Sequence, residues 1–452
     1  MTSPLLRADD EQTLTGWGRT APSVSRYVKV NNAAEIQALI AQASPRGILA
    51  RGLGRSYGDA AQSGGAVVLD TSGLNTIALD ERAAMVTAGA GASLDAILRM
   101  IVPRGFFIPV SPGTRMVTVG GAIAADVHGK NHHVEGSFGS HVASMTLVNG
   151  RAEVRTVSPD DGAPFWSTIG GMGLTGVITE ASFDVLPITS SYISVDTERG
   201  TDLDDVMARM VARDDEYRYS VAWIDSVHPS GRGVITRGDH APAEALPAKK
   251  RSSALAFDPR IIATAPKVVP SGVLNTLTVR AFNEAWFRKH PKSQTGALHT
   301  IGAFFHPLDG VQEWNRIYGP RGFLQYQFVV PDDRGDLVGT ALRRLREVGA
   351  PSFLTVLKRF GAGNAAPLSF PKPGWTLAVD VAAGVDGLGM VLDELDELVA
   401  DAGGRLYLAK DSRQSAAMMH RTYPDLPAWR AARSTMDPNN IFTSDLGRRL
   451  SL

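Results

Sequence analysis

The side chains best suited to chemistry stand in one glycine-rich stretch, residues 112–133, which reads PGTRMVTVGGAIAADVHGKNHH. Its glycines and alanines would leave backbone N–H groups uncovered, and such a bare segment can lie against a flat, phosphorylated cofactor. Tight turns between strands would explain the same glycines. Four titratable side chains close the stretch: His128, Lys130, His132 and His133. A zinc site made from the histidines is disfavoured, because Gly129 and Asn131 are poor helix formers and no acidic partner is evident.

A second glycine-rich loop, RGLGRSYGD at residues 51–59, follows a predicted strand. It fails as a Rossmann dinucleotide site, because Tyr57 stands where the third glycine should be and the next residues make a poor helix. The spacing of Gly171, Gly173 and Gly176 fits that motif, but a strand is expected after it in place of a helix. Several loops that each donate N–H groups predict a cofactor held between substructures.

Two further polar side chains can each be interpreted in two ways. Lys410 follows a predicted strand, and Asp411 and Arg413 beside it favour a surface ion pair. Its position where two regions of the chain meet favours a role in a site. Gln327, in the strand sequence QYQF, would face either solvent or the site, since successive strand side chains alternate between faces.

The first 190 residues alternate short strands with helices. Asn32 and Ser93 are expected to cap helices at 33–43 and 94–102. Strands are predicted at 47–50, 66–70, 84–88, 142–148 and 152–157, and Asn149-Gly150 marks a hairpin between the last two.

From about residue 191 to 404 the strands become longer and richer in aromatic residues: 217–224, 298–306, 323–330, 352–360 and 375–381. Amphipathic patterns predict helices at 336–348 and 388–400, and Thr201 with Asp204 resembles a capping box for a third. The expected fold class is α+β, with one antiparallel sheet backed by helices.

The pattern breaks down between residues 241 and 292, where basic side chains interleave with Phe282, Trp286 and Phe287. This segment is either a solvated loop or a mobile lid that touches lipid headgroups or an apolar tail.

The composition excludes several classes of protein. Lys plus Arg and Asp plus Glu balance at 46 each, so no global field attracts nucleic acid. The absence of cysteine excludes disulfides, thiolate metal sites and iron–sulfur clusters. The first twelve residues carry acids where a signal peptide needs an apolar core, and no run approaches the ~18 apolar residues of a membrane span. Membrane contact is therefore expected to be peripheral.

Five segments together resemble the FAD domain of the vanillyl-alcohol-oxidase, or PCMH-type, flavoproteins: RGLGRSYGD, the 112–133 stretch, GSFGSHV, GGMGLTGVI and DPNNIF. Four more are similar to family members that oxidise decaprenylphosphoryl-β-D-ribose: LTGWGRTAPS, YGPRGFLQYQFVVP, NAAPLSFPKPGW and KDSR. The resemblance covers nearly the whole chain. It implies an FAD-binding domain in two parts, 1–188 and 405–452, around a substrate-binding domain, 189–404.

The resemblance also implies the chemistry. Such enzymes oxidise the ribose C2′ hydroxyl of a polyprenyl-phosphate sugar to a ketone and pass hydride to the flavin; an NAD(P)H-dependent keto-reductase partner then completes epimerisation to the arabinose donor. Lys410 would take or stabilise the hydroxyl proton, because partial desolvation lowers the pKa of a lysine, and His128 and Tyr57 would lie beside it. A packed, hydrogen-bonded role for His128 is the alternative.

The matched motifs assign two further sets of residues. The expected substrate-binding residues are Gln327, Lys358, Lys130, Ala378 and Thr376. The expected FAD-binding residues are Arg51, Gly52, Leu53, Gly54, Arg55, Ser56, Tyr57, Gly58, Asp59, Gly113, Thr118, Val119, Gly120, Gly121, Ala125, Asp126, Val127, His128, Ile178 and Tyr407.

Three positions depart from the family pattern. Relatives that tether FAD covalently use a histidine where this chain has Arg55, so FAD is expected to be non-covalent. The mycobacterial oxidases carry a cysteine, the target of nitroaromatic inhibitors, where this chain has Ala378, so no covalent adduct is expected. An asparagine two residues earlier is replaced by Thr376, which leaves the fine substrate contacts open.

Two other functions suit the same sequence: a sugar-lactone or alditol oxidase, or a flavin-bearing protein that scaffolds its reductase without turnover. The lid-like segment favours a lipid-bearing substrate, and the intact Lys410 and His128 favour turnover. The expected location is the cytoplasm, with peripheral membrane association; the cell-envelope side is the alternative.

Overall fold

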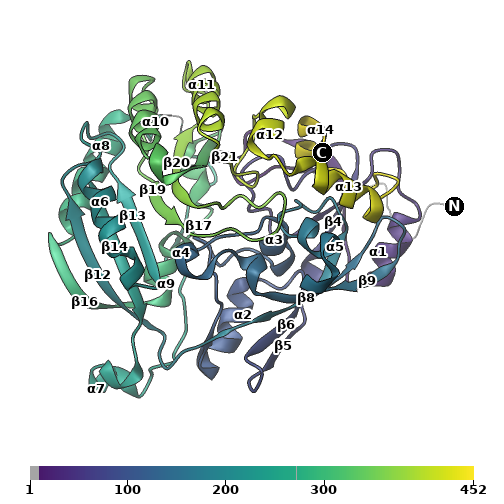
Figure 1. Cartoon of the computed structure of the whole chain (residues 1–452), viewed down its shortest axis with the longest axis horizontal. Coiled ribbons are helices and arrows are strands. Elements are labelled where there is room, and N and C mark those ends of the chain that lie inside the picture. The colour runs from purple at the N-terminus through teal and green to yellow at the C-terminus, as the bar shows by residue number, and fades with distance from the viewer. Residues whose placement is uncertain (1–9, 271) are drawn as a thin grey trace.

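The computed structural model describes residues 10–270 and 272–452. The first nine residues of the predicted FAD-binding part, with the start of the acidic N-terminus, lie outside this range. The chain forms a mixed α+β fold with a large antiparallel sheet, which confirms the predicted fold class (Figure 1). The division at 188/189 and 404/405 remains a prediction.

A four-stranded sheet near the N-terminus has the order β1-β2-β4-β3. Its strands are β1 (Glu11–Leu14), β2 (Ser23–Lys29), β3 (Ile48–Arg51) and β4 (Val67–Asp70), and β4 is parallel to both β2 and β3. Helix α1 (Ala33–Ile40) begins as predicted, because the Asn32 side chain accepts the N–H of Glu35. The 51–59 loop therefore starts at the carboxyl end of a parallel strand.

A five-stranded sheet of order β5-β6-β10-β8-β9 follows. Its strands are β5 (Ile77–Asp80), β6 (Met85–Gly89), β8 (Val142–Val148), β9 (Val154–Val157) and β10 (Val177–Asp184), and the predicted β8–β9 hairpin is present. Its helices are α2 (Leu94–Ile101), α3 (Val119–Ala124), α4 (His132–Glu135) and α5 (Ala163–Thr168). Ser93 caps α2 as expected, and the glycine-rich stretch runs from the α2 side of this core through α3 and α4.

The third sheet has eight strands in the order β16-β12-β14-β13-β19-β20-β18-β21, and every pair is antiparallel. The strands are β12 (Tyr192–Gly200), β13 (Tyr219–Ile224), β14 (Gly233–His240), β16 (Ser293–Thr300), β18 (Phe323–Val330), β19 (Thr355–Phe360), β20 (Gly374–Ala382) and β21 (Arg405–Leu406). Helices α6 (Leu203–Arg213), α10 (Asp336–Glu347) and α11 (Leu388–Asp401) share one hydrophobic core with this sheet and line up along it in Figure 1. The face that they leave uncovered is available for a site.

The remaining elements are short or close the chain. They are β7 (Phe106–Phe107) paired with β11 (Leu186–Pro187), β15 (Ala263–Thr264) paired with β17 (Val311–Gln312), and helices α7 (Ala248–Arg251), α8 (Thr276–Lys289), α9 (Ile301–Phe305), α12 (Ala416–Thr422), α13 (Leu426–Met436) and α14 (Asp445–Leu450). The last three helices share a core with β3 and β4 through residues such as Trp429 and Leu446. The two ends of the chain therefore fold together.

Three sequence predictions were wrong in detail. The strand predicted at 298–306 ends at Thr300, which caps α9, because Ile301, Phe304 and Phe305 are buried at helical spacing. Asp202, one residue after the predicted Thr201, caps α6 by accepting the N–H of Asp205.

The 241–292 segment, predicted as a loop or lid, contains a 14-residue helix, α8. Asn275 begins this helix through a capping box with Thr278, a polar signal that the interleaved basic residues obscure.

Candidate active site

A cavity of about 460 Å³ lies between the glycine-rich loops and the uncovered face of the eight-stranded sheet. Most residues predicted for the site line it: Gly52, Leu53, Gly54, Arg55, Ser56, Tyr57, Gly113, Thr118, Gly120, Gly121, Ala125, Val127, His128, Lys130, Ile178, Gln327, Lys358, Ala378, Tyr407 and Lys410. The fold thus brings loops from both ends of the chain onto one cavity.

Six predicted residues do not line this cavity: Arg51, Gly58, Asp59, Val119, Asp126 and Thr376. Arg51 donates to the carbonyls of Thr15 and Ala61, and Asp59 pairs with Arg449 at 2.7 Å. A Cβ on Gly58 would lie 1.8 Å from the Asp411 carbonyl oxygen, so this glycine permits close contact between two loops.

The other three residues, Val119, Asp126 and Thr376, lie behind the cavity wall and support it. Val119 is in the hydrophobic core, and the buried Asp126 accepts hydrogen bonds from the side chains of Ser137, Asn364 and Ser369. The buried Thr376 hydroxyl accepts a 3.3 Å hydrogen bond from Gln327.

The 51–59 loop provides a cradle for an anionic group. Within the described parts of the chain, none of the backbone N–H groups from Gly52 to Ser56 donates to a protein acceptor. A Cβ on Gly52 would lie 2.2 Å from the Thr118 hydroxyl oxygen, so only glycine allows this loop to approach α3. Unpaired N–H groups in a glycine-rich loop suit a pyrophosphate, so these residues fit FAD.

The N–H groups of the 112–133 stretch are less available than the sequence suggested. Gly120 N–H donates to the Ala90 carbonyl, and Gly121 N–H donates to the Thr118 hydroxyl that caps α3. Gly113 N–H donates to no acceptor in the described residues, and a Cβ there would meet nothing within 4 Å. The stretch therefore contributes a flat wall more than a set of anion donors.

Lys410 lies beside Tyr57 in the cavity wall, and its Nζ is 3.8 Å from the centre of the tyrosine ring. Gln325 connects this pair to a buried carboxylate: its amide donates to the Tyr57 hydroxyl at 3.3 Å and to Asp380. Burial lowers the pKa of Lys410 to about 7, although the Asp380 charge opposes the change. Burial likewise raises the pKa of Asp380 to about 7. An amine of this kind can accept a proton near neutral pH.

His128 lies at the centre of a second polar group. Its Nδ1 is 3.0 Å from Lys358 Nζ, and its Nε2 is 3.0 Å from the Gln327 side-chain nitrogen. Burial and the neighbouring Lys358 charge hold the pKa of His128 well below its usual value, so the ring is neutral. Both the packed role and the cavity-lining role expected for His128 are therefore present, and Gln327 faces the site rather than solvent.

Two more lysines line the cavity. Lys130 Nζ donates to the Phe304 carbonyl at 2.5 Å and lies 4.1 Å from the Phe304 ring centre. Burial lowers the pKa values of Lys130 and Lys358 to about 7. For Lys358 the charges of Lys130 and Lys410 contribute as well. The cavity therefore holds three amines that an anionic ligand would stabilise in the charged form.

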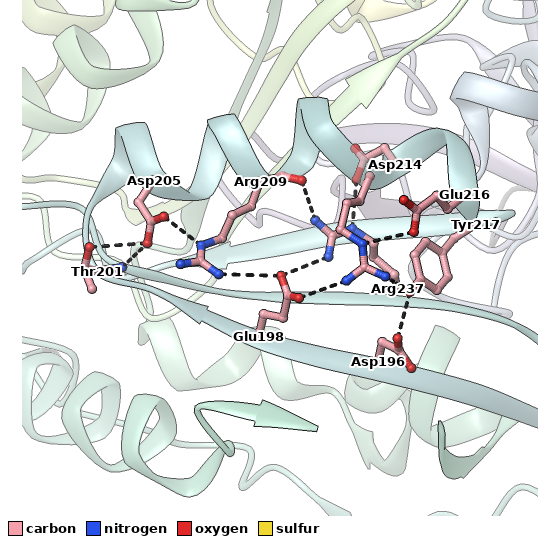
Figure 2. A network of polar contacts seen from close by, with 10 residues as sticks. Asp196, Glu198, Thr201, Asp205, Arg209, Asp214, Glu216, Tyr217 and Arg237 are labelled. Atoms are coloured by element: carbon pink, nitrogen blue, oxygen red, sulfur yellow. Dashed lines mark hydrogen bonds and ion pairs between the residues drawn. The ribbon is translucent and has the colours of Figure 1, made fainter. Parts of the chain in front are cut away.

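Figure 2 shows a polar network around Arg237, Asp214 and Glu198, and Ser220 connects this network to the backbone of Lys130. Arg237, on β14, pairs with Asp214 at 3.2 Å and with Glu198 of β12 at 3.3 Å. Asp214 also accepts a 2.6 Å hydrogen bond from the Ser220 hydroxyl, and Ser220 N–H donates to the Lys130 carbonyl. The sheet thus holds the end of the glycine-rich stretch in place.

His132 does not join the polar site. It is buried against Phe360, with ring centres 4.5 Å apart, and neither ring nitrogen has a hydrogen-bond partner in the described residues. Over residues 10–270 and 272–452, no group of three or more His, Asp or Glu side chains is arranged to hold a metal ion. Within that same range, no helix is long and apolar enough to cross a membrane.

Sequence reasoning missed several wall residues. The Arg55 guanidinium carbon lies 3.8 Å from the centre of the Trp17 ring. Trp286 of α8 and His290, the residue after this helix, extend the cavity wall. Trp223 and Gln325 also line the cavity. Period-two alternation places Trp223 with Val221 and Gln325 with Gln327, which was the available signal for these two.

Comparison with known proteins places this site in a family. Residues 24–158 match an FAD binding domain, and residues 390–450 match a D-arabinono-1,4-lactone oxidase domain. The chain is 43% identical over 449 residues to decaprenylphosphoryl-β-D-ribose oxidase of Mycolicibacterium smegmatis, with 97% of each chain covered.

More distant relatives extend the comparison. An uncharacterised protein of Streptomyces coelicolor is 38% identical over 373 residues, covering 80% of this chain and 100% of that protein. L-gulono-1,4-lactone dehydrogenase of Mycobacterium tuberculosis is 23% identical over 450 residues, covering 96% and 97%. The chain is therefore an FAD-dependent oxidoreductase and belongs to the PCMH-type flavoprotein family that includes decaprenylphosphoryl-β-D-ribose oxidase.

Proposed function

We propose that this enzyme oxidises the ribose 2′-hydroxyl of decaprenylphosphoryl-β-D-ribose to the 2′-keto intermediate, the first half of the epimerisation that makes the arabinose donor for cell-wall arabinan. The observation that carries the proposal is the placement of Lys410. Its amine has a pKa of about 7 and lines the same cavity as the open N–H groups of the 51–59 loop. The 43% identity to decaprenylphosphoryl-β-D-ribose oxidase of Mycolicibacterium smegmatis supports it.

The proposed residues have distinct tasks. Bound FAD supplies the hydride acceptor for the C2′ carbon. Lys410 Nζ takes the hydroxyl proton, and Tyr57 holds the amine through its ring face. Gln325 and Asp380 orient Tyr57 from behind. His128 and Gln327 form a neutral polar wall for the sugar, with Thr376 supporting Gln327.

The substrate phosphate would bind next to Lys130 and Lys358. Lys130 and Lys358 line the cavity with pKa values near 7, and a phosphodiester anion favours their charged forms. Binding of the substrate should therefore be accompanied by proton uptake. Ala378 lies opposite Gln327 in the β18–β20 register and leaves room beside the sugar.

Several further points belong to the proposal. FAD is bound non-covalently, because Arg55 stands where the family resemblance implies a tethering histidine, and a guanidinium does not form that bond. Acid precipitation should then release all the flavin from the polypeptide. The 2′-keto product passes to an NAD(P)H-dependent keto-reductase. The enzyme works in the cytoplasm in peripheral contact with the membrane, and its FAD-binding domain comprises 1–188 and 405–452 around the substrate-binding domain 189–404.

A sugar-lactone oxidase is the second candidate. The domain match at 390–450 and the 23% identity to L-gulono-1,4-lactone dehydrogenase favour it. The higher identity to the ribose oxidase and the extended 241–292 segment favour the lipid-linked sugar.

Product analysis separates these candidates. The holoenzyme with an artificial electron acceptor should convert polyprenylphosphoryl-ribose to a product two hydrogens lighter, with the new carbonyl at C2′. Free alditols and sugar lactones should react at a small fraction of that kcat/KM. Preferred turnover of a lactone or an alditol would contradict the proposal.

A further inference from the structure

Exposed apolar side chains are concentrated in one segment beside the cavity. Twelve large hydrophobic residues are exposed in the described parts of the chain, and six of them fall between residues 261 and 282. We call these six the apolar rim: Ile261, Ile262, Val268, Val273, Leu277 and Phe282. Ile262, Val268 and Leu277 are 85%, 84% and 76% exposed. Large exposed apolar residues that gather in one segment of the chain favour an interaction surface there.

The apolar rim is attached to the cavity wall on both sides. On one side, β15 pairs with β17, and Leu308 and Trp314, which lie on either side of β17 in sequence, both line the cavity. On the other side, Phe282 stacks on Trp286 with ring centres 6.0 Å apart, and Trp286 is a wall residue of α8. Apolar surface therefore continues from the outside of the molecule into the cavity.

The segment around the apolar rim is strongly basic. Residues 241–292 contain nine Lys or Arg and three Asp or Glu, in a chain whose formal net charge is zero. Lys267 and Arg280 are exposed among the rim residues and form no ion pair with another described residue. Apolar side chains surrounded by cations are complementary to an anionic lipid surface.

A second copy of this chain fits the surface less well. A two-fold contact through the apolar rim would bring the same excess of positive charge from each copy together. Electrostatic repulsion would then oppose the apolar gain, whereas an anionic bilayer satisfies both features at once.

We propose that the apolar rim and its flanking cations dock the enzyme on an anionic membrane surface, with the cavity mouth against the lipid. This docking deepens the proposed function. The polyprenyl tail stays in the bilayer while the phosphate and ribose enter the cavity along Phe282 and Trp286, and this path of the substrate rests on the proposed function. The docking itself depends only on the surface and not on the identity of the sugar.

Vesicle co-sedimentation of the flavin-loaded enzyme tests the docking. The test variant replaces Ile262, Val268 and Leu277 by serine. The matched control replaces three exposed apolar residues outside the rim, Val154, Val211 and Met390, by serine. Serine removes apolar area without adding charge, so neither variant changes electrostatic attraction. Retained FAD absorbance shows that each variant is folded.

The wild type should bind phosphatidylglycerol-containing vesicles, bind phosphatidylcholine vesicles far less, and dissociate as salt is raised. The rim variant should bind anionic vesicles at least roughly tenfold less, because it lacks three apolar side chains that would enter the bilayer, while the control stays within about twofold of the wild type. Equal binding of the two variants, or no wild-type binding, would overturn the proposal. So would a wild-type dimer that becomes a monomer in the rim variant, because a second copy would then cover the rim.

A soluble short-chain polyprenylphosphoryl-ribose separates this proposal from the proposed function. The rim variant should reduce its flavin with this substrate at the wild-type rate, since none of the three residues lines the cavity. Vesicle binding without any flavin reduction in the wild type would leave the docking intact and reject the proposed reaction. Reduction without rim-dependent vesicle binding would do the reverse.

Discussion

The Nζ of Lys410 lies 3.8 Å from the centre of the Tyr57 ring, so two segments from opposite ends of the chain meet at one amine. The contact is set by the backbone: Tyr57 N–H donates to the Ala409 carbonyl at 2.8 Å, and Gly58 packs directly on Asp411. The glycine-rich loop that offers free N–H groups to a cofactor is thus the same loop that positions the base.

Removing the amine should stop the chemical step. With Lys410→Met we expect the rate of flavin reduction by substrate to fall roughly 10²- to 10⁴-fold, the usual contribution of a general base. FAD content should be unchanged, because the N–H groups of the 51–59 loop remain. Stopped-flow absorbance of the flavin measures the rate, and Lys29→Met, an exposed lysine on β2, is the control. A reduction rate within a few-fold of the wild type would remove Lys410 from the mechanism.

The pH profile should report the same amine. Because burial lowers the pKa of Lys410 to about 7, its neutral form grows as pH rises through 7. The flavin reduction rate should therefore increase through that range and level off above it. An unperturbed lysine would delay the rise to about pH 10.

The carboxylate near Lys410 provides a directional test of this assignment. The Asp380 charge raises the pKa of Lys410, so Asp380→Asn should move the inflection of the pH profile to lower pH. An inflection that moves upward in Asp380→Asn, or a profile without any inflection between about pH 5 and 9, contradicts the assignment.

The buried amine of Lys358 should lower the free energy of unfolding at neutral pH. Its pKa in the folded protein is about 7, lowered mainly by burial, while in the unfolded chain it stays at about 10.4. Between these values the unfolded chain holds the extra proton, so this lysine destabilises the fold at pH 7 and less so as pH rises.

Lys358→Met should therefore raise Tm at pH 7 by about 1–3 °C, with the gain shrinking toward pH 10. Thermal scans of the flavin-loaded protein across this range measure it, again with Lys29→Met as control. At the same time kcat/KM should fall, because His128 Nδ1 loses its 3.0 Å partner. A lower Tm in Lys358→Met at pH 7 would show that the amine stabilises the fold.

Ala378 predicts a pattern of inhibition. The side chain lines the cavity opposite Gln327. At this position the family resemblance implies a reactive cysteine in the mycobacterial oxidases. The wild type should form no covalent adduct when it turns over with a nitroaromatic inhibitor of those enzymes. Ala378→Cys should gain one adduct per chain, visible in the intact mass, with Ala383→Cys, two residues after Val381 and outside the cavity lining, as control. An adduct on the wild type would place the reactive position elsewhere.

The sequence predicted those parts of the site that local patterns encode. Glycine-rich loops, strand alternation around Gln327 and the caps at Asn32 and Ser93 depend on neighbouring residues, so they were visible. The part of the cavity wall formed by α8 could not be predicted, because the capping box of this helix is followed by mixed charged and aromatic residues without a clear apolar stripe. Thr376, Ala378 and Asp380 alternate along β20 and so share one face. Asp380 was not among the predicted site residues, because its link to Tyr57 runs through Gln325 of the neighbouring strand β18.

Long-range contacts explain the remaining differences. Gly120 and Gly121 looked like open N–H donors, yet the turn of α3 and the Ala90 carbonyl use both groups. His132 looked like a polar neighbour of His128, yet it packs on Phe360 of β19. Gly120 and His132 depend on partners far away in the chain that no local pattern specifies, whereas Gly121 is used locally by the Thr118 cap of α3.

Anaerobic flavin reduction decides whether this enzyme oxidises the lipid-linked ribose with Lys410 as the base. The oxygen-free holoenzyme is mixed with polyprenylphosphoryl-ribose, and flavin absorbance is followed in the wild type and in Lys410→Met. We expect full bleaching of the wild-type flavin in a single turnover and bleaching slowed at least about 100-fold in the variant. A wild-type flavin that stays oxidised with this substrate but bleaches with a free alditol or sugar lactone would contradict it.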